Sequence, residues 1–244
     1  MSIQKIAIIT GGSRGIGASI SRRLAVEGFA VVINYVSKPE NALSLVKEIQ
    51  SLGHTAMALQ CDIADPESVK QLFDKTESTL GKVNVLVNNA GCMQLAPIAQ
   101  STDALFDKHI ATNFKGTFNA LREASQRLAQ EGRIINMSSS LVGLKLEEYG
   151  VYAATKAAIE TLTGILAKEL KGTGITVNAI APGPTATELF LQGKTEQQIQ
   201  HLSMMSPMQR LGTPADIANL VAFLSGPESS WVNGQTIRAN GGMV

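Results

Sequence analysis

The stretch Ile6-Ala7-Ile8-Ile9-Thr10-Gly11-Gly12-Ser13-Arg14-Gly15-Ile16-Gly17 decides the fold of this 244-residue chain. It predicts a buried strand that runs into a glycine-rich loop, and the amphipathic stretch 18–27 follows as a predicted helix. Glycines permit a tight turn and close backbone approach, and a helix N-terminus offers free N–H groups to a pyrophosphate. The spacing Gly-x3-Gly-x-Gly is not the standard GxGxxG, so alone the loop indicates only a nucleotide site, with a ligand-free turn as the alternative.

The same alternation of strand and helix continues along the chain. Further strands are predicted at 30–35, 55–60, 83–88, 133–138, 175–180 and, more weakly, 235–238, with helices at 40–52, 66–80, 103–128, 149–170 and 215–224. Most strands are continuous apolar runs, as parallel strands covered on both faces are. The sequence therefore predicts an α/β fold: a single Rossmann-type doubly wound domain over residues 1–244, with about seven parallel strands and helices on both faces.

Composition and charge argue against several classes of protein. Twenty-one Lys and Arg against twenty Asp and Glu give a net charge of +1, which gives no electrostatic basis for binding nucleic acid or an anionic membrane. No apolar run approaches the about 18 residues of a membrane span, and the N-terminal stretch does not resemble a signal peptide, so a cytoplasmic location is expected. Cys61, Cys92 and the three scattered histidines lack ligand spacing, so no metal is expected.

The predicted helix 103–128 carries a strong apolar pattern. Large apolar residues recur every three or four positions, at Phe106, Ile110, Phe114, Phe118, Leu121 and Leu128. This spacing predicts one buried stripe along the helix. Asn113 lies on or beside that stripe, where a polar side chain needs hydrogen-bond partners.

A family resemblance appears when the glycine loop is read with three later segments. Asn88-Asn89-Ala90-Gly91 follows the fourth strand, Ser139 follows the fifth, and Tyr152-x3-Lys156 lies in the next helix. With these motifs the chain resembles the classical short-chain dehydrogenase/reductase family over essentially its whole length. Its size and the segment 174–178 are most similar to 3-oxoacyl-(acyl carrier protein) reductases. The resemblance implies hydride transfer between a nicotinamide and a ketone or secondary alcohol, chemistry that side chains cannot perform alone.

The predicted catalytic residues are Asn113, Ser139, Tyr152 and Lys156. Tyr152 and Lys156 are four residues apart and share one helix face, so the ammonium is expected to lower the pKa of the phenol and make it a usable general acid and base. The resemblance assigns Ser139 to the substrate carbonyl, with Ser140 as the alternative within the triple serine. It also gives Asn113 a part in holding a proton-relaying water, although a satisfied core amide fits that residue equally well.

The residues after the second strand indicate which nicotinamide cofactor binds. The stretch 34–38 has no acid to bind the ribose hydroxyls, whereas Arg14 and Lys38 suit a 2′-phosphate, so NADP(H) is predicted. For Asp62, which follows the third strand, a local turn residue is the alternative to a cofactor contact. The glycine loop and the resemblance together predict these cofactor contacts: Gly11, Ser13, Arg14, Gly15, Ile16, Gly17, Tyr35, Asp62, Ile63, Asn89, Ala90, Gly91, Tyr152, Lys156, Pro182, Gly183, Thr185 and Thr187.

The substrate and the partners are less closely defined. Residues 187–213 are the expected variable lid, and their methionines predict tolerance of several carbonyl compounds, although a simple surface helix fits as well. A general NADPH-dependent ketone reductase is the leading prediction, because Thr173 stands where carrier-protein reductases tend to have a basic residue. A 3-oxoacyl-carrier-protein reductase is the alternative, and a non-catalytic dinucleotide-binding regulator is a third. A homotetramer joined through 103–128 and 149–170 is also expected.

Overall fold

Seven parallel strands form the centre of the computed structural model, which describes residues 4–244. The strands are β1 (Ile6–Ile9), β2 (Ala30–Tyr35), β3 (Ala56–Gln60), β4 (Val85–Asn88), β5 (Arg133–Met137), β6 (Thr176–Pro182) and β7 (Thr236–Ala239). Their order across the sheet is β3-β2-β1-β4-β5-β6-β7. The predicted parallel sheet is confirmed, with strand ends that differ from the prediction by one or two residues. Residues 1–3 of the predicted domain lie outside the described residues.

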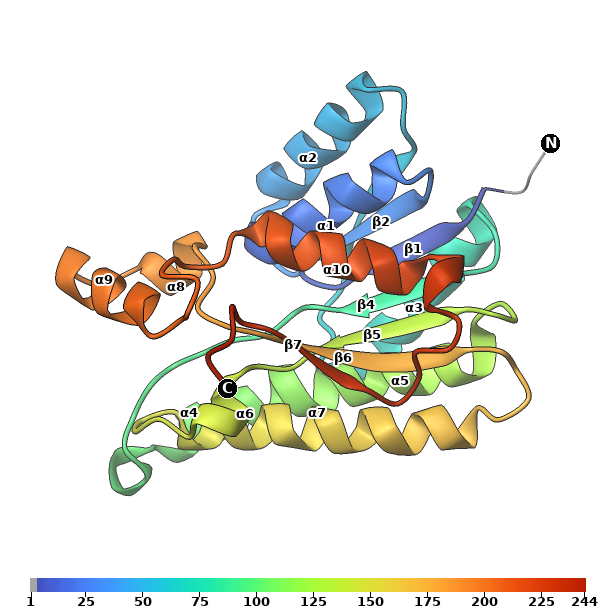
Figure 1. The fold of residues 1–244 in the computed structure, drawn as a ribbon. Helices are drawn as coiled ribbons and strands as arrows, with labels where there is room; N and C mark the ends of the chain where they lie inside the picture. The colour runs from blue at the N-terminus through green and yellow to red at the C-terminus, as the bar shows by residue number, and fades with distance from the viewer. Residues whose placement is uncertain (1–3) are drawn as a thin grey trace.

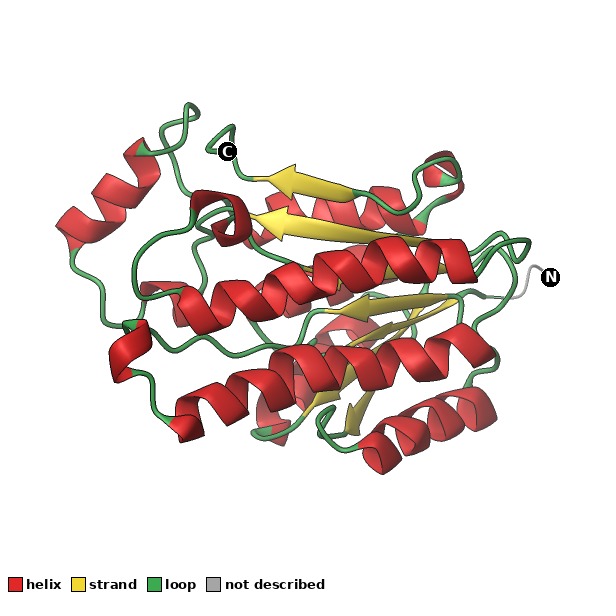
Figure 2. Ribbon diagram, turned by 90° about the horizontal axis from the view of Figure 1, so that it is seen from below, coloured by secondary structure: helices red, strands yellow, loops and turns green. Residues whose placement is uncertain are grey.

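Helices cover both faces of this sheet (Figure 1). One face carries α1 (Gly15–Val26), α2 (Pro39–Ser51) and α10 (Pro214–Ser225), and the other carries α3 (Pro66–Thr79), α5 (Gly116–Arg127) and α7 (Gly150–Glu169). Alternate residues of one strand feed two separate cores: Ala7 and Ile9 pack with the first group of helices, and Ile6 and Ile8 with the second. Figure 2 shows from below how the long helices lie across the strands. Burial on both faces explains why the strands are continuous apolar runs.

Shorter elements connect these layers. They are α4 (Asp103–His109), α6 (Leu141–Leu144), α8 (Glu188–Leu191), α9 (Glu196–Met204), the 3-10 turns η1 (Ile98–Gln100) and η3 (Pro227–Ser229), and the π-helical segment η2 (Ile110–Lys115). No helix among residues 4–244 is long and apolar enough to cross a membrane.

The predicted helix 103–128 differs from expectation in two ways. It is a continuous run of α4, η2 and α5, with a π turn in the middle. The prediction of one buried stripe is wrong, because Phe106 and Phe118 are 50% and 44% exposed, while the face that packs inward carries Leu105, Asn113 and Ala120. The inner face is narrow: a Cβ on Gly116 would lie 2.6 Å from the Ile63 side chain. Small and polar residues fit there, so Phe106 and Phe118 face outward, whereas Leu121 and Leu128 of the predicted stripe are buried as expected.

The strand order places the site. It reverses between β1 and β4, since β2 continues the sheet on one side of β1 and β4 on the other. In open α/β sheets, ligands bind at such a point, beyond the carboxyl ends of the strands. The glycine loop, the Asn88-Asn89-Ala90-Gly91 segment and the triple serine all follow strands at this edge.

Candidate active site

Buried side chains fix the glycine loop after β1. The Asn34 Oδ1 accepts a hydrogen bond from the Gly11 N–H at 3.1 Å, and the Asn89 amide donates to the carbonyls of Thr10 and Gly11, each at 3.0 Å. The Thr10 hydroxyl accepts from the N–H groups of Asn89 and Ala90 at 2.9 and 3.0 Å. The side-chain amide of Asn89, predicted to lie along a ribose, therefore donates to the loop itself.

Two glycines of this loop have no room for a side chain. A Cβ on Gly17 would overlap the Gly11 carbonyl and lie 2.6 Å from the Asn89 amide, and a Cβ on Gly11 would lie 2.9 Å from the Ala90 Cα. Helix α1 begins directly after Arg14 with no side-chain cap and no acid in its first turn. Its free N–H groups and partial positive charge are thus available to a phosphate group.

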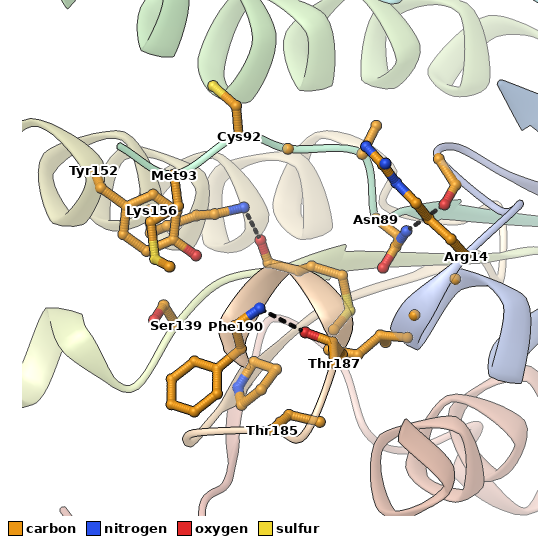
Figure 3. A pocket seen from close by; sticks show the side chains of 18 of the residues that line it. Arg14, Asn89, Cys92, Met93, Ser139, Tyr152, Lys156, Thr185, Thr187 and Phe190 are labelled. Atoms are coloured by element: carbon orange, nitrogen blue, oxygen red, sulfur yellow. Dashed lines mark hydrogen bonds between the residues drawn. The ribbon is translucent and has the colours of Figure 1, made fainter. Parts of the chain in front are cut away.

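Most of the predicted site residues line one cleft of about 470 Å³. All eighteen predicted cofactor contacts line it, as does Ser139, whereas Asn113 does not. In Figure 3, Tyr152, Lys156 and Ser139 lie together at one end, and Arg14 and Asn89 lie at the other. Among the described residues, no group of three His, Cys, Asp or Glu is placed to hold a metal ion.

The end of the cleft beside β2 suits a 2′-phosphorylated ribose. Its lining includes Tyr35, Ser37, Lys38 and Asn41, with Arg14 from the glycine loop, and contains no carboxylate from the segment after β2. An NAD-type site needs such a carboxylate to bind the ribose hydroxyls. The residues present therefore fit NADP(H).

Asp62, which follows β3 next to β2 in the sheet, has the local role that the sequence left open. Its carboxylate accepts the Ala64 N–H at 2.9 Å, so it shapes the turn after β3 while also lining the cleft.

The geometry separates the three serines after β5. The Ser138 hydroxyl donates to Glu160 at 2.6 Å, and the Ser140 hydroxyl donates to the Ala181 carbonyl at 3.0 Å. The Ser139 hydroxyl accepts the Leu141 N–H at 3.3 Å and lies at the same end of the cleft as Tyr152, where it lowers the pKa of that phenol. The arrangement favours Ser139 over Ser140 as the partner of a substrate carbonyl.

The electrostatics of Tyr152 and Lys156 differ from expectation. Burial in the cleft raises the pKa of Tyr152 to about 12, and only the hydrogen bond with Ser139 opposes that rise. Burial also lowers the pKa of Lys156 to about 8, because a charged amine is disfavoured away from water. The Lys156 Nζ donates to the Met137 carbonyl at 2.8 Å and lies 5.8 Å from the centre of the Tyr152 ring. The expected lowering of the phenol pKa by the ammonium is therefore wrong for this structure, since burial outweighs it.

The Asn113 side chain is fully buried, and both its oxygen and its nitrogen form hydrogen bonds. Its Oδ1 accepts the Cys92 N–H at 2.8 Å, and its Nδ2 donates to the Cys92 carbonyl at 2.9 Å and to the Thr155 hydroxyl at 3.2 Å. It lies in the π turn η2, behind the cleft. The side chain thus clamps the segment after β4 to helix α7, one turn of which carries Lys156. The geometry supports the alternative of a satisfied core amide for the side chain.

The sequence missed His109, which lies against Tyr152. It is fully buried, and its ring meets the Tyr152 ring edge-on, with centroids 6.4 Å apart and planes at 78°. The Nε2 accepts the Gln94 N–H at 3.1 Å, so the Nδ1 carries the proton and donates to the Leu105 carbonyl at 2.8 Å. No sequence signal marked it, because its partners are backbone groups.

The apolar wall beside Ser139 and Tyr152 was also missed. It consists of Met93, Leu144, Leu146, Tyr149, Phe190, Leu202, Met205 and Met243. Of the lid methionines, only Met205 lines the cleft, and Met204 and Met208 are 55% and 62% exposed. These residues come from separate segments that carry no shared motif, so nothing in the local pattern singled them out.

Comparisons with known proteins agree with this site. A family model described as Enoyl-(Acyl carrier protein) reductase matches residues 11–244. A short-chain type dehydrogenase/reductase of Picea abies is 44% identical, covering 98% of this chain and 92% of its own. An NADPH-dependent aldehyde reductase-like chloroplastic protein of Arabidopsis thaliana is 43% identical (98% and 94%), and a 3-oxoacyl-(acyl carrier protein) reductase of Staphylococcus aureus is 39% identical (100% and 99%).

Solved structures show the same fold. A dehydrogenase/reductase from Sinorhizobium meliloti superposes with a TM-score of 0.94 at 40% identity, covering 99% of this chain and 97% of that one. A short-chain dehydrogenase from Burkholderia cenocepacia in complex with NADP superposes with a TM-score of 0.93 at 36% identity (99% and 98%). The fold and the cleft define a dinucleotide-binding oxidoreductase. The chain belongs to the short-chain dehydrogenase/reductase family.

Proposed function

We propose that the protein is an NADPH-dependent reductase that interconverts a ketone and a secondary alcohol, with Tyr152 as general acid and base. NADP(H) is the cofactor: the cleft fits it, one solved relative holds NADP, and another relative is named NADPH-dependent. The observation that carries the proposal is that Ser139, Tyr152 and the apolar wall line one end of the cleft together, with the Lys156 amine 5.8 Å from the centre of the tyrosine ring.

The protonation states suit reduction at neutral pH. NADPH, when bound, supplies the hydride. The hydroxyls of Ser139 and Tyr152 bind the substrate carbonyl oxygen, and Tyr152, with its pKa at about 12, still holds the proton that this oxygen needs. As the carbonyl carbon gains hydrogen, its oxygen becomes an alkoxide, a stronger base than a phenolate, and takes the proton from the Tyr152 Oη. The Lys156 ammonium then stabilises the tyrosinate until solvent returns a proton.

The lining of the substrate end favours an uncharged carbonyl compound with an apolar group. Five charged residues line the cleft, and three of them, Arg14, Lys38 and Asp62, belong to its cofactor half. A fourth, Lys156, donates a hydrogen bond from its amine to the Met137 carbonyl. The remaining one is Glu188 on the lid, an exposed acid that disfavours anionic substrates. Aldehydes belong to the same chemical class, so both aldehydes and ketones are candidate substrates.

A 3-oxoacyl thioester reductase is the second candidate. The Staphylococcus aureus relative named for that activity covers the whole chain, and an apolar wall also suits an acyl group. Thr173, in the loop between α7 and β6, provides no charge for an acidic carrier protein. A β-keto thioester offered free and on a carrier protein separates the candidates: only the carrier-protein reductase would strongly prefer the carrier.

We also propose a homotetramer joined through α4, α5 and α7. Phe106 of α4 and Phe118 of α5 are 50% and 44% exposed, and Ile165 of α7 is 47% exposed. Large apolar side chains gathered on one face favour contact with another subunit. Light scattering that gives a monomer would reject this proposal. The cytoplasmic location and the single domain over 1–244, with its lid at 187–213, stay predictions.

The decisive test is the initial rate of NADPH oxidation with a β-keto ester and an aldehyde, for wild type and Tyr152→Phe. Removing a general acid typically costs about 10²- to 10⁴-fold, so the variant should lose about a thousandfold in kcat. Cofactor binding, measured by NADPH fluorescence, should be kept, which shows that the variant is folded. Tight NADPH binding without turnover of any carbonyl by wild type would favour the non-catalytic regulator.

A further inference from the structure

The C-terminal turn, residues 240–244, is tied to the strand that carries the catalytic serine. After β7, the nearly buried Asn240 donates from Nδ2 to the Ser140 hydroxyl at 2.9 Å and to the Val244 carbonyl at 3.2 Å. Its Oδ1 accepts the N–H groups of Gly242 and Met243 at 3.0 and 3.2 Å. One side chain thus satisfies all its donors and folds the turn back on itself. Because Ser140 is next to Ser139, the Asn240–Ser140 hydrogen bond fixes the position of the turn relative to Ser139.

The same turn also holds the lid. The buried Ser206, which follows α9, donates to the Gly241 carbonyl at 2.9 Å and accepts the Met208 N–H at 3.1 Å. The contact is close, because a Cβ on Gly241 would overlap the Ser206 hydroxyl and one on Gly242 would lie 3.2 Å from Pro207. The lid therefore has an anchor here besides its base, where Thr185 pairs with Gly212.

This arrangement places Met243 in the substrate half of the cleft. Met243 lines the cleft together with Leu202 and Met205 of the lid and Leu144 of α6. The turn packs on α6, since a Cβ on Gly143 would lie 2.9 Å from a Val244 methyl group. In Figure 1 the C-terminus lies beside α6, at the end of the sheet from which α8 and α9 project.

We propose that the C-terminal turn is a wall of the substrate pocket and that Asn240 is a positioning residue for substrate length. Asn240 holds Met243 in the lining of the pocket, and Gly241 of the same turn is hydrogen-bonded to Ser206 of the lid. We call the hydrogen bonds of Asn240 and of Ser206 with Gly241 the latch. The latch then sets the length of the apolar chain that fits in the pocket. The inference deepens the proposed carbonyl reductase function and rests on it for its substrate, while the latch itself is testable without turnover.

The first test measures the latch by trypsin cleavage of the NADPH-bound protein at Lys194 and Arg210, both within the lid. Trypsin should cleave Asn240→Ala and Ser206→Ala there at least about fivefold faster than wild type. This ratio corresponds to a loss of about 1 kcal/mol in the free energy that holds the lid closed. Matched controls are Asn178→Ala and Ser229→Ala, since both residues are buried and hydrogen-bonded but do not line the cleft. Equal cleavage in the latch variants and their controls would overturn the latch.

The second test measures substrate length as the ratio of kcat/KM for decanal to that for butanal. Met243→Ala should raise this ratio and Met243→Phe should lower it, each by about fivefold, or about 1 kcal/mol. Asn240→Ala should shift the ratio as well, and Asn240→Asp, which keeps the acceptor for Gly242 and Met243, should shift it less. Equal losses for both aldehydes in all these variants would overturn the positioning role.

The two tests keep the latch apart from the proposed function. Wild type that turns over neither aldehyde, nor any other carbonyl compound, refutes the proposed function, and the cleavage rates alone then decide the latch. Normal turnover with an unchanged length ratio refutes the substrate wall and leaves the proposed function intact.

Discussion

The two ends of the cleft are built on different principles. At the cofactor end, Asn34 and Thr10 accept hydrogen bonds from backbone N–H groups, Asn89 donates to a backbone carbonyl, and glycines pack where no side chain fits. At the substrate end, the wall is made of apolar side chains such as Met93, Phe190 and others from separate segments. The cofactor end therefore presents backbone hydrogen-bond donors in fixed positions. The substrate end presents an apolar surface whose shape depends only on side chains.

The difference has a physical basis. A dinucleotide carries the same phosphates and riboses whatever the substrate, so directional backbone groups can bind it. An apolar group is bound by contact area, which is not directional, and methionines adapt to different shapes. Changes at the cofactor end should therefore have large, sharp effects, and changes at the substrate end should have small, graded ones.

A matched pair of glycine substitutions should show the largest contrast. Gly17→Ala puts a methyl group 2.6 Å from the Asn89 amide, and such overpacking costs about 1 to 3 kcal/mol, so the Kd for NADPH should rise by up to about a hundredfold. Gly164→Ala, in α7, meets nothing within 4 Å and has no positive φ, so it should leave that Kd within about twofold. Fluorescence titration measures both. Similar Kd values for the two variants would contradict the contrast.

The choice between NADPH and NADH should depend on Arg14. A hydrogen bond to a charged group contributes about 1.5 to 3 kcal/mol, so Arg14→Ala should weaken NADPH binding by about twentyfold and leave NADH binding nearly unchanged. Arg22→Ala is the control, because Arg22 pairs with Glu48 on the surface instead. Equal weakening of both cofactors by Arg14→Ala would show that Arg14 contacts a group that the two share.

The pH dependence of reduction should report Lys156. Its pKa is lowered to about 8, so the ammonium is present below that pH and is lost above it. The value of kcat/KM for reduction should fall about tenfold per unit above pH 8, whereas Tyr152, with its pKa at about 12, keeps its proton over this range. Lys156→Arg stays charged and should lose the fall above pH 8. A fall that persists in this variant would assign the titration to another group.

The smallest effect is expected in the lid. Met205 is a flexible side chain in a wall that has other apolar members, so Met205→Ala should change KM for an apolar aldehyde by less than about fivefold. Met204→Ala, one residue away and 55% exposed, is the matched control and should change it less. A hundredfold effect of Met205→Ala would mean that the substrate end is as sharply defined as the cofactor end.

Single residues show where sequence reasoning stopped. The spacing of Ser139, Tyr152 and Lys156 was readable, and the structure brings these three together in the cleft. The resemblance favoured Ser139 over Ser140, and the structure distinguishes the two because the Ser140 hydroxyl donates to the Ala181 carbonyl of β6. The pKa of Tyr152 was misjudged for a related reason, since burial is a property of the whole cleft.

The sequence by itself determined the parallel sheet, the glycine loop and the family, since apolar runs, turn residues and motif spacing act over a few neighbouring residues. Only the tertiary structure decided which face of 103–128 is buried, that His109 contacts Tyr152, that Asn240 is hydrogen-bonded to Ser140, and that Met243 lines the cleft. These features depend on contacts between segments far apart in the chain. Periodicity marks an apolar face, but the shape of the neighbouring surface decides whether that face or another one packs inward.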